Sequence, residues 1–238
     1  MPHQICYLCG AALKPPINND HVPPRQLYVK EIRIAHSPTN LLTLPTHTSC
    51  NSSYQLDEDY FVNTLAPLCR GTYAGDALLR DVFDKYSRGE KQSLVHKVLQ
   101  EFDRTPSGLQ LPPSLIAKRI EGARVHRVAW KIVRGLYYHE LGIYLPESTP
   151  NQFSIVPPNT PPPEPFPSVL AGQESRGAYP SVFDYKFVIA QELQGFSYWG
   201  FLLWDSLIFT MAFHGSQCQC DQCYHIKAAR SDTTSKDT

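Results

Sequence analysis

Two pairs of metal-ligand side chains stand near the N-terminus with the same short spacing. Residues 6–9 read CYLC and residues 47–50 read HTSC. A two-residue gap lets a tight turn present both side chains to one tetrahedral ion, and zinc prefers thiolate and imidazole ligands. We therefore predict a structural Zn²⁺ with no open coordination position. Its ligands are Cys6, Cys9, His47 and Cys50; the alternative is spare thiols beside a loop histidine.

An acid and a histidine, Asp20 and His21, lie between the two pairs, and Asn51 follows the last ligand directly. If one ion joins the pairs, these three residues belong to the segment that it encloses. An imidazole is suited to take a proton from water near neutral pH, because its ordinary pKa lies there. Taken alone, the stretch DHVPP also fits a surface turn in which the Asp20 side chain accepts a backbone hydrogen bond.

The order of four motifs carries a family resemblance. C-x-x-C, DHVPP, TNLLTL and H-x-x-C-N, all within residues 3–60, resemble the zinc-knuckle subtype of the HNH endonucleases, which cut phosphodiester bonds with a ββα-metal motif. The resemblance implies that His21 is the general base that activates water. It implies that Asp20 and Asn51 bind a catalytic Mg²⁺ or Mn²⁺, and that Asn40 holds its loop or orients His21. The substrate we expect is double-stranded DNA.

The sequence departs from the family pattern at two positions. His47 stands where many zinc-bearing members have cysteine, and imidazole is an ordinary zinc ligand. Asn51 stands where the last motif residue is histidine in many members. The second departure leaves the preferred catalytic ion open among Mg²⁺, Mn²⁺ and other divalent ions.

Charge gives no global signal for nucleic acid. The chain of 238 residues carries 22 basic and 22 acidic side chains, with a pI near 7.1, so attraction to phosphate must come from a local patch. A long helix is predicted over residues 114–141, with apolar and basic residues on opposite faces. We expect the basic face to be solvated. This face and Arg25 are the candidate contacts with nucleic acid. The residues of that face are Arg124, Arg127, Lys131 and Arg134.

The pattern along the chain predicts an α+β fold. Residues 1–60 form the zinc-stapled ββα-metal unit, which is too small for a core of its own, and residues 61–145 form a helical region. Residues 146–181 are rich in proline and read as a linker or surface loop. Residues 182–215 form an antiparallel β-hairpin packed on the helices, and residues 216–238 a cysteine-rich flexible tail. Whether Cys218, Cys220, Cys223 and His225 bind a second metal stays open.

The sequence also predicts the cellular location of the protein and its class. Seven cysteines, an odd number, and an N-terminus without a signal peptide favour a reducing cytoplasm. The apolar segment 196–213 is read as buried strand rather than membrane helix, because Asp205 lies within it. The rival to an enzyme is a catalytically inactive zinc-stabilised module that binds nucleic acid or acts as a scaffold. Such a module needs only the four zinc ligands, whereas Asp20, His21 and Asn51 favour the enzyme.

Overall fold

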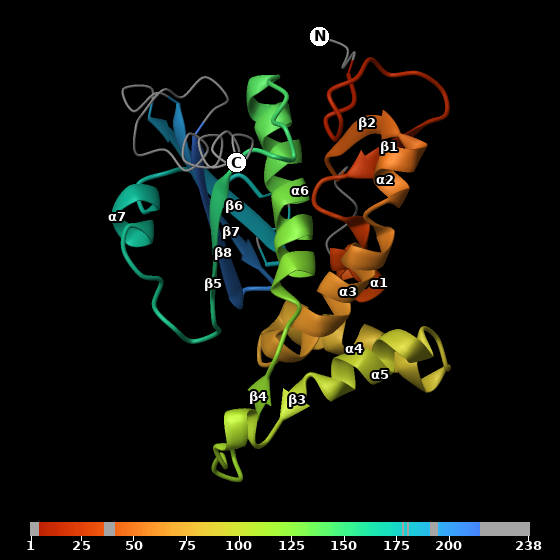
Figure 1. The fold of residues 1–238 in the computed structure, drawn as a ribbon, viewed down its shortest axis with the longest axis vertical. Helices are drawn as coiled ribbons and strands as arrows, with labels where there is room; N and C mark the ends of the chain where they lie inside the picture. The colour runs from red at the N-terminus through yellow and green to blue at the C-terminus, as the bar shows by residue number, and fades with distance from the viewer. Residues whose placement is uncertain (1–4, 36–40, 178, 180, 191–194, 215–238) are drawn as a thin grey trace, which may run out of the picture.

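A computed structural model describes residues 5–35, 41–177, 179, 181–190 and 195–214. Its centre is the long helix α6 (Gly122–Leu141). Figure 1 shows α6 standing between a four-stranded sheet and the N-terminal strands and helices. The model is thus a mixture of helix and sheet, as predicted.

The N-terminal unit is a two-stranded sheet followed at once by helices. β1 (Ile17–His21) pairs antiparallel with β2 (Thr43–His47), so that Ile17 lies opposite His47. α2 (Thr48–Ser52) begins directly after β2, and α3 (Gln55–Leu65) follows. Between the strands lie η1 (Arg25–Leu27) and α1 (Lys30–Ala35). The predicted strand through His21 and the helix beginning after His47 are therefore both present.

The helical region continues with η2 (Ala66–Cys69), α4 (Tyr73–Ser87) and α5 (Gln92–Gln100). A small hairpin of β3 (Phe102–Asp103) and β4 (Ala117–Lys118) follows, with η3 (Pro106–Gly108) between its strands. The helix predicted from residue 114 begins only at Gly122, because residues 117–118 pair with β3. A buried ion pair between Lys118 and Glu101 closes this hairpin.

The C-terminal sheet is larger than the predicted hairpin. Its order is β5 (Asn151–Val156), β8 (Leu207–His214), β7 (Phe196–Leu203) and β6 (Phe183–Ala190), all antiparallel. The apolar run 196–213 divides at a turn in which Trp204 and Asp205 have φ of 52° and 50°. Asp205 thus lies in a turn, and among the described residues no helix is long and apolar enough to span a membrane.

The proline-rich segment does contain regular structure. β5 forms an edge strand against β8, and α7 (Phe166–Leu170) lies beside β6. The prediction of a linker or surface loop over residues 146–181 is therefore wrong for residues 151–156 and 166–170. Residues 151–156 contain no proline, so each backbone N–H on the paired side is free to join the ladder.

Both sides of α6 are buried, which joins the parts into one core. On the sheet side, the Trp130 and Phe213 rings meet at 5.2 Å. On the other side, α6 packs on the N-terminal unit, and its basic residues face that unit instead of solvent. Lys131 is 1% and Arg134 0% exposed, so the expectation of a solvated basic face is wrong for these two residues. The apolar core is continuous across the boundary predicted near residue 60.

Candidate functional site

The four predicted zinc ligands come together at one end of the β1–β2 ladder. Cys6 and Cys9 lie in the turn before β1, His47 ends β2, and Cys50 lies in α2. Their ligand atoms all lie within 4.8 Å of one another. A tetrahedral ion with bonds of about 2.0 to 2.3 Å holds its ligands about 3.3 to 3.8 Å apart, so the side chains need to close by only about 1 Å to share one ion. The group could therefore hold a metal ion, and three thiolates with one imidazole form a donor set suited to structural zinc.

The backbone around the cysteines has the shape that a metal knuckle requires. Gly10 has φ of +74°, and its N–H donates to the Cys6 carbonyl at 2.8 Å. A Cβ at Gly10 would lie 2.7 Å from the Tyr144 ring, so only glycine suits both the conformation and the contact. His47 turns Nδ1 toward the Cys9 sulfur at 3.4 Å, while Nε2 lies 3.2 Å from the Ala12 carbonyl. With Nδ1 on a metal, Nε2–H donates to Ala12 and fixes the ring.

The thiols of the cluster have unequal acidities. Burial opposes ionisation of Cys6, but backbone N–H groups, first that of His47, lower the pKa of Cys6 below its ordinary value. Burial, followed by the neighbouring Cys9 and Cys6, raises the pKa of Cys50 to about 12. Crowded thiols cannot all ionise without a compensating charge, and a bound cation supplies that charge.

Asp20 lies on β1, and its side chain belongs to a buried polar cluster. Its side chain accepts a hydrogen bond from the Tyr7 hydroxyl at 2.6 Å and pairs with Lys131 Nζ at 2.8 Å. The same nitrogen lies 2.5 Å from Glu58 Oε1 and 3.3 Å from Asn51 Oδ1. The side chains of Asp20 and Asn51, which were predicted to share a divalent ion, thus converge on one position. The ammonium nitrogen of Lys131 occupies that position.

A glycine one helical turn beyond Lys131 explains how α6 comes so close. A Cβ at Gly135 would lie 2.7 Å from Val22 Cγ2 and 3.2 Å from the Tyr7 ring. Any larger residue would push the helix away from β1 and from the turn that carries Tyr7. Residues four apart lie on the same helix face, so this contact also places the Lys131 side chain over Asp20.

The oxygen atoms of Asp20 and Asn51 do not fit a catalytic divalent ion in this arrangement. An ammonium nitrogen at hydrogen-bond distance from both leaves no space for a second cation at the same position. Glu58 shows how strongly the pocket disfavours uncompensated charge, because burial raises the pKa of its carboxyl although Lys131 opposes the shift. We therefore assign no chemical step to Mg²⁺ or Mn²⁺.

His21 ends β1 beside this cluster and is half-buried. Burial lowers the pKa of His21, and the positive charges of Arg25 and Lys131 lower it further, against the opposing effect of Asp20. The imidazole is therefore neutral at neutral pH, which is the form that accepts a proton. Arg25 is exposed in η1 and available to an anion. Asn40, and the cysteines and histidine of residues 218–225, lie outside the described residues.

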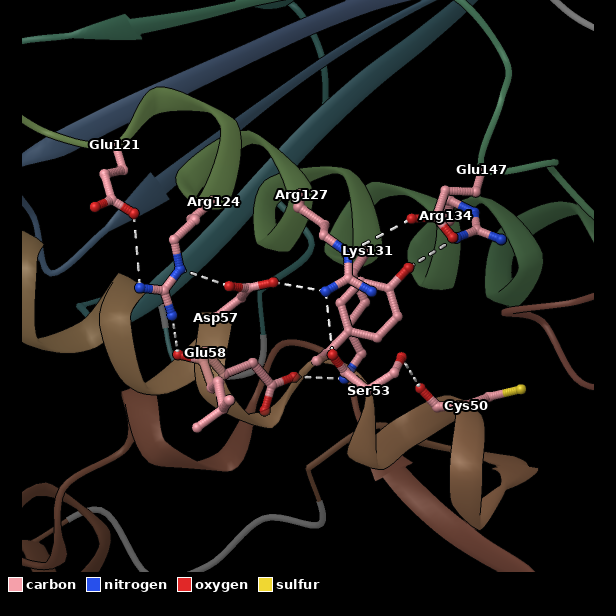
Figure 2. Close-up of polar contacts among 12 residues, drawn as sticks. Cys50, Ser53, Asp57, Glu58, Glu121, Arg124, Arg127, Lys131, Arg134 and Glu147 are labelled. Atoms are coloured by element: carbon pink, nitrogen blue, oxygen red, sulfur yellow. Dashed lines mark hydrogen bonds and ion pairs between the residues drawn. The ribbon is translucent and has the colours of Figure 1, made fainter. Parts of the chain in front are cut away.

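The remaining basic residues of α6 are bound to the protein's own acceptors, as Figure 2 shows. Arg124 and Arg127 each contact Asp57 of α3 at 2.6 Å. Arg134 donates to the carbonyl oxygens of Leu145 and Leu8. These contacts give the basic face a structural role. Lys131 and Arg134 are buried and present no surface to nucleic acid, whereas Arg124 and Arg127 remain partly exposed.

Asp57→Asn tests the contact between α3 and α6. Burial raises the pKa of Asp57, but the hydrogen bonds from Arg124 and Arg127 outweigh it and lower this pKa below its ordinary value. We expect the substitution to reduce the free energy of unfolding at pH 7 by about 1.5 to 3 kcal/mol. A lowered folded-state pKa stabilises the protein above the unfolded value, near 3.9, and that contribution fades as pH falls through the folded value. Denaturant titrations should therefore show wild type and variant converging below about pH 3.9.

The matched control for this prediction is Asp81→Asn. Asp81 forms a more exposed pair with Lys85 on α4. Its loss should change the free energy of unfolding by about 0.5 kcal/mol or less. Equal effects of the two substitutions, or a difference that does not depend on pH, would contradict the role given to Asp57.

Lys131→Met tests the buried ion cluster. Methionine keeps most of the apolar stem and removes the charge, which leaves Asp20 and Glu58 without their cation. Removing one partner from a buried ion pair costs about 3 to 5 kcal/mol, and we expect a loss of this size in urea unfolding. Lys91→Met is the control, because Lys91 is 43% exposed in its pair with Asp59 and should cost about 1 kcal/mol or less. A small effect of Lys131→Met would show that the cluster is not tightly paired.

The motifs point to Asp20, His21 and Asn51 but not to the residues around them. Tyr7 is an intervening residue of the CYLC motif, and Glu58 belongs to none of the motifs. Lys131 is predicted to be a solvated cation. Its burial could have been suspected from Gly135, because a glycine within a helix often marks a close approach of another element.

Comparison with known proteins gives no match: no family model, no curated protein and no solved structure is significantly similar to this chain. The resemblance to HNH endonucleases therefore depends on the motifs in residues 3–60 alone.

Proposed function

We propose that this protein is a nuclease of the HNH type, which hydrolyses phosphodiester bonds in nucleic acid. The observation that carries the proposal is that the half-buried, neutral His21 stands beside Asp20 on β1 and close enough to the exposed Arg25 for the Arg25 charge to lower the pKa of His21. β1 provides Asp20 and His21, α2 provides Asn51, and the Cys/His group joins the two elements. We propose Zn²⁺ as the ion of that group.

The chemistry assigned to His21 is general base catalysis. Its neutral imidazole takes a proton from a water molecule, whose oxygen bonds to phosphorus as the bond from phosphorus to the leaving sugar oxygen breaks. The leaving oxygen then takes a proton from solvent. Arg25 is the exposed cation that acts on His21, and we assign it to a phosphate oxygen of the substrate. The choice of double-stranded DNA as substrate comes from the family resemblance.

A second candidate function is supported by one observation. Lys131 fills the position that the resemblance gives to the catalytic ion, as expected if the unit is a zinc-stabilised scaffold without catalysis. The two functions differ in whether any phosphodiester bond is cut.

A cleavage panel separates them. Zinc-loaded protein would be incubated with supercoiled plasmid, linear duplex, single-stranded DNA and RNA, each without added divalent ion and with Mg²⁺ or Mn²⁺. A nuclease converts at least one of these substrates, and the rate should fall with salt if phosphate contacts hold the substrate. If none of them is cut under any condition, the nuclease proposal fails and the scaffold remains.

A further inference from the structure

The contacts of Lys131 Nζ use all the hydrogen bonds that an ammonium group can donate. Its partners are the two Asp20 oxygens at 2.8 and 3.0 Å, Glu58 Oε1 at 2.5 Å and Asn51 Oδ1 at 3.3 Å. An ammonium carries three protons and no acceptor, so three partner residues satisfy it. The side chain of Lys131 is only 1% exposed, which leaves no proton for substrate or solvent.

The charge of this cluster is arranged around a cation. Two carboxylates, Asp20 and Glu58, converge from β1 and α3, with side chains 5% and 14% exposed. Carboxylates this far from water need a positive partner, because an unpaired buried charge costs several kcal/mol. The Tyr7 hydroxyl donates to Asp20, and burial together with the Asp20 charge raises the pKa of Tyr7 well above its ordinary value. Tyr7 therefore stays neutral and adds no further charge.

The helical turn that follows Lys131 holds it in place. One turn ahead, Gly135 lies against Val22 and Tyr7 with no space for a Cβ. In the same turn, Arg134 is fully buried and donates from Nε to the Leu145 carbonyl at 2.8 Å. Withdrawing Lys131 from the cluster would require its stem to leave a closely packed interface.

We propose that the ε-ammonium of Lys131 is the resident cation of this site and replaces the divalent ion that HNH resemblance implies. The lysine neutralises Asp20 and Glu58, holds Asn51, and excludes Mg²⁺ and Mn²⁺ from the same oxygen atoms. This inference deepens the proposed function, since it concerns the same site, but it makes a claim about ion binding that holds with or without cleavage.

Binding of Mn²⁺ tests the proposal in the absence of nucleic acid. Zinc-loaded wild type, Asp20→Asn, Lys131→Ala and the double variant Asp20→Asn/Lys131→Ala would be titrated with Mn²⁺, with the free ion followed by electron paramagnetic resonance. Alanine is used here because it vacates the space that an ion needs. Lys91→Ala is the matched control, since Lys91 pairs with the single carboxylate of Asp59.

The proposal predicts that wild type and Asp20→Asn bind Mn²⁺ equally weakly. Lys131→Ala should gain one site, at least about tenfold tighter than any in wild type, because two carboxylates and an amide oxygen become available. The double variant should lose that site, and Lys91→Ala should gain none. Circular dichroism and zinc content establish that each variant is folded.

Two results would overturn the proposal. The first is a Mn²⁺ site in wild type that Asp20→Asn abolishes, which would mean that Lys131 moves aside for the metal. The second is a folded Lys131→Ala variant that gains no site. Should Lys131→Ala fail to fold, the comparison of wild type with Asp20→Asn still decides, because the proposal requires that they do not differ. These outcomes concern Mn²⁺ binding alone, so a failure to detect phosphodiester cleavage would not change any of them.

Discussion

Loss of zinc from the Cys/His group is expected to unfold the N-terminal unit. Structural zinc in zinc-finger peptides contributes about 10 to 16 kcal/mol of apparent binding free energy, while a whole domain is stable by about 5 to 15 kcal/mol. Among residues 5–21 the fully buried apolar side chains are only those of Cys6, Tyr7 and Leu8, so an ion at the Cys/His group would supply much of what fixes this segment. The change in structure should extend to Asp20, because Tyr7 links the knuckle to that carboxylate.

Single ligand substitutions measure this effect. Cys6→Ala and Cys50→Ala should each reduce the zinc content by one equivalent per chain and lower the midpoint of thermal unfolding. Cys69→Ala is the control, because Cys69 is buried between α3 and α4, where its sulfur contacts the Leu65 carbonyl. It should keep the zinc of the wild type. Unchanged zinc content in Cys6→Ala would contradict the assignment of the ligands.

The parts of the site that the sequence predicts are those fixed by local spacing. The two-residue gaps in CYLC and HTSC determine how a turn presents two ligands, whatever the rest of the chain does. Asp20 and His21 are adjacent on one strand, and Asn51 follows a ligand, so their proximity follows once the pairs are joined. The four Cys/His side chains do lie together, and Asp20 and Asn51 both contact Lys131 Nζ.

The contacts made by α6 could not be predicted from local spacing. Helical periodicity separated its apolar face from its basic face correctly, but periodicity does not say what each face meets. In most surface helices the charged face meets water, whereas α6 has the sheet on one side and the N-terminal unit on the other. The carboxylates that receive its basic residues, Asp57 and Glu58, come from a helix some 65 to 75 residues earlier, and no local pattern links the two segments.

Local sequence predicts the C-terminal sheet only in part. Residues 182–215 are predicted as a β-hairpin from their β-branched and aromatic content, which is a local property. The turn at Trp204 and Asp205 was missed because it lies within the apolar run FLLWDSLIF, which contains no glycine or proline to mark a break, although aspartate itself tolerates positive φ. β5 was missed because prolines on both sides outweighed the six residues that pair with β8.

The central claim is that His21 acts as a general base, and His21→Ala should lower cleavage by about 10² to 10⁴-fold. Alanine removes the proton acceptor, while the ligands of the zinc and the contacts of Lys131 do not involve the His21 side chain. The variant should therefore keep its zinc and its unfolding midpoint. His139→Ala is the matched control, because His139 is exposed near the end of α6 and should leave the rate unchanged.

The most direct measurement is the single-turnover rate of phosphodiester cleavage by wild type, His21→Ala and His139→Ala, on the best substrate of the panel and at equal zinc content. The account predicts a rate for His21→Ala at least about a hundredfold below the other two. Cleavage by His21→Ala at the wild-type rate would contradict it.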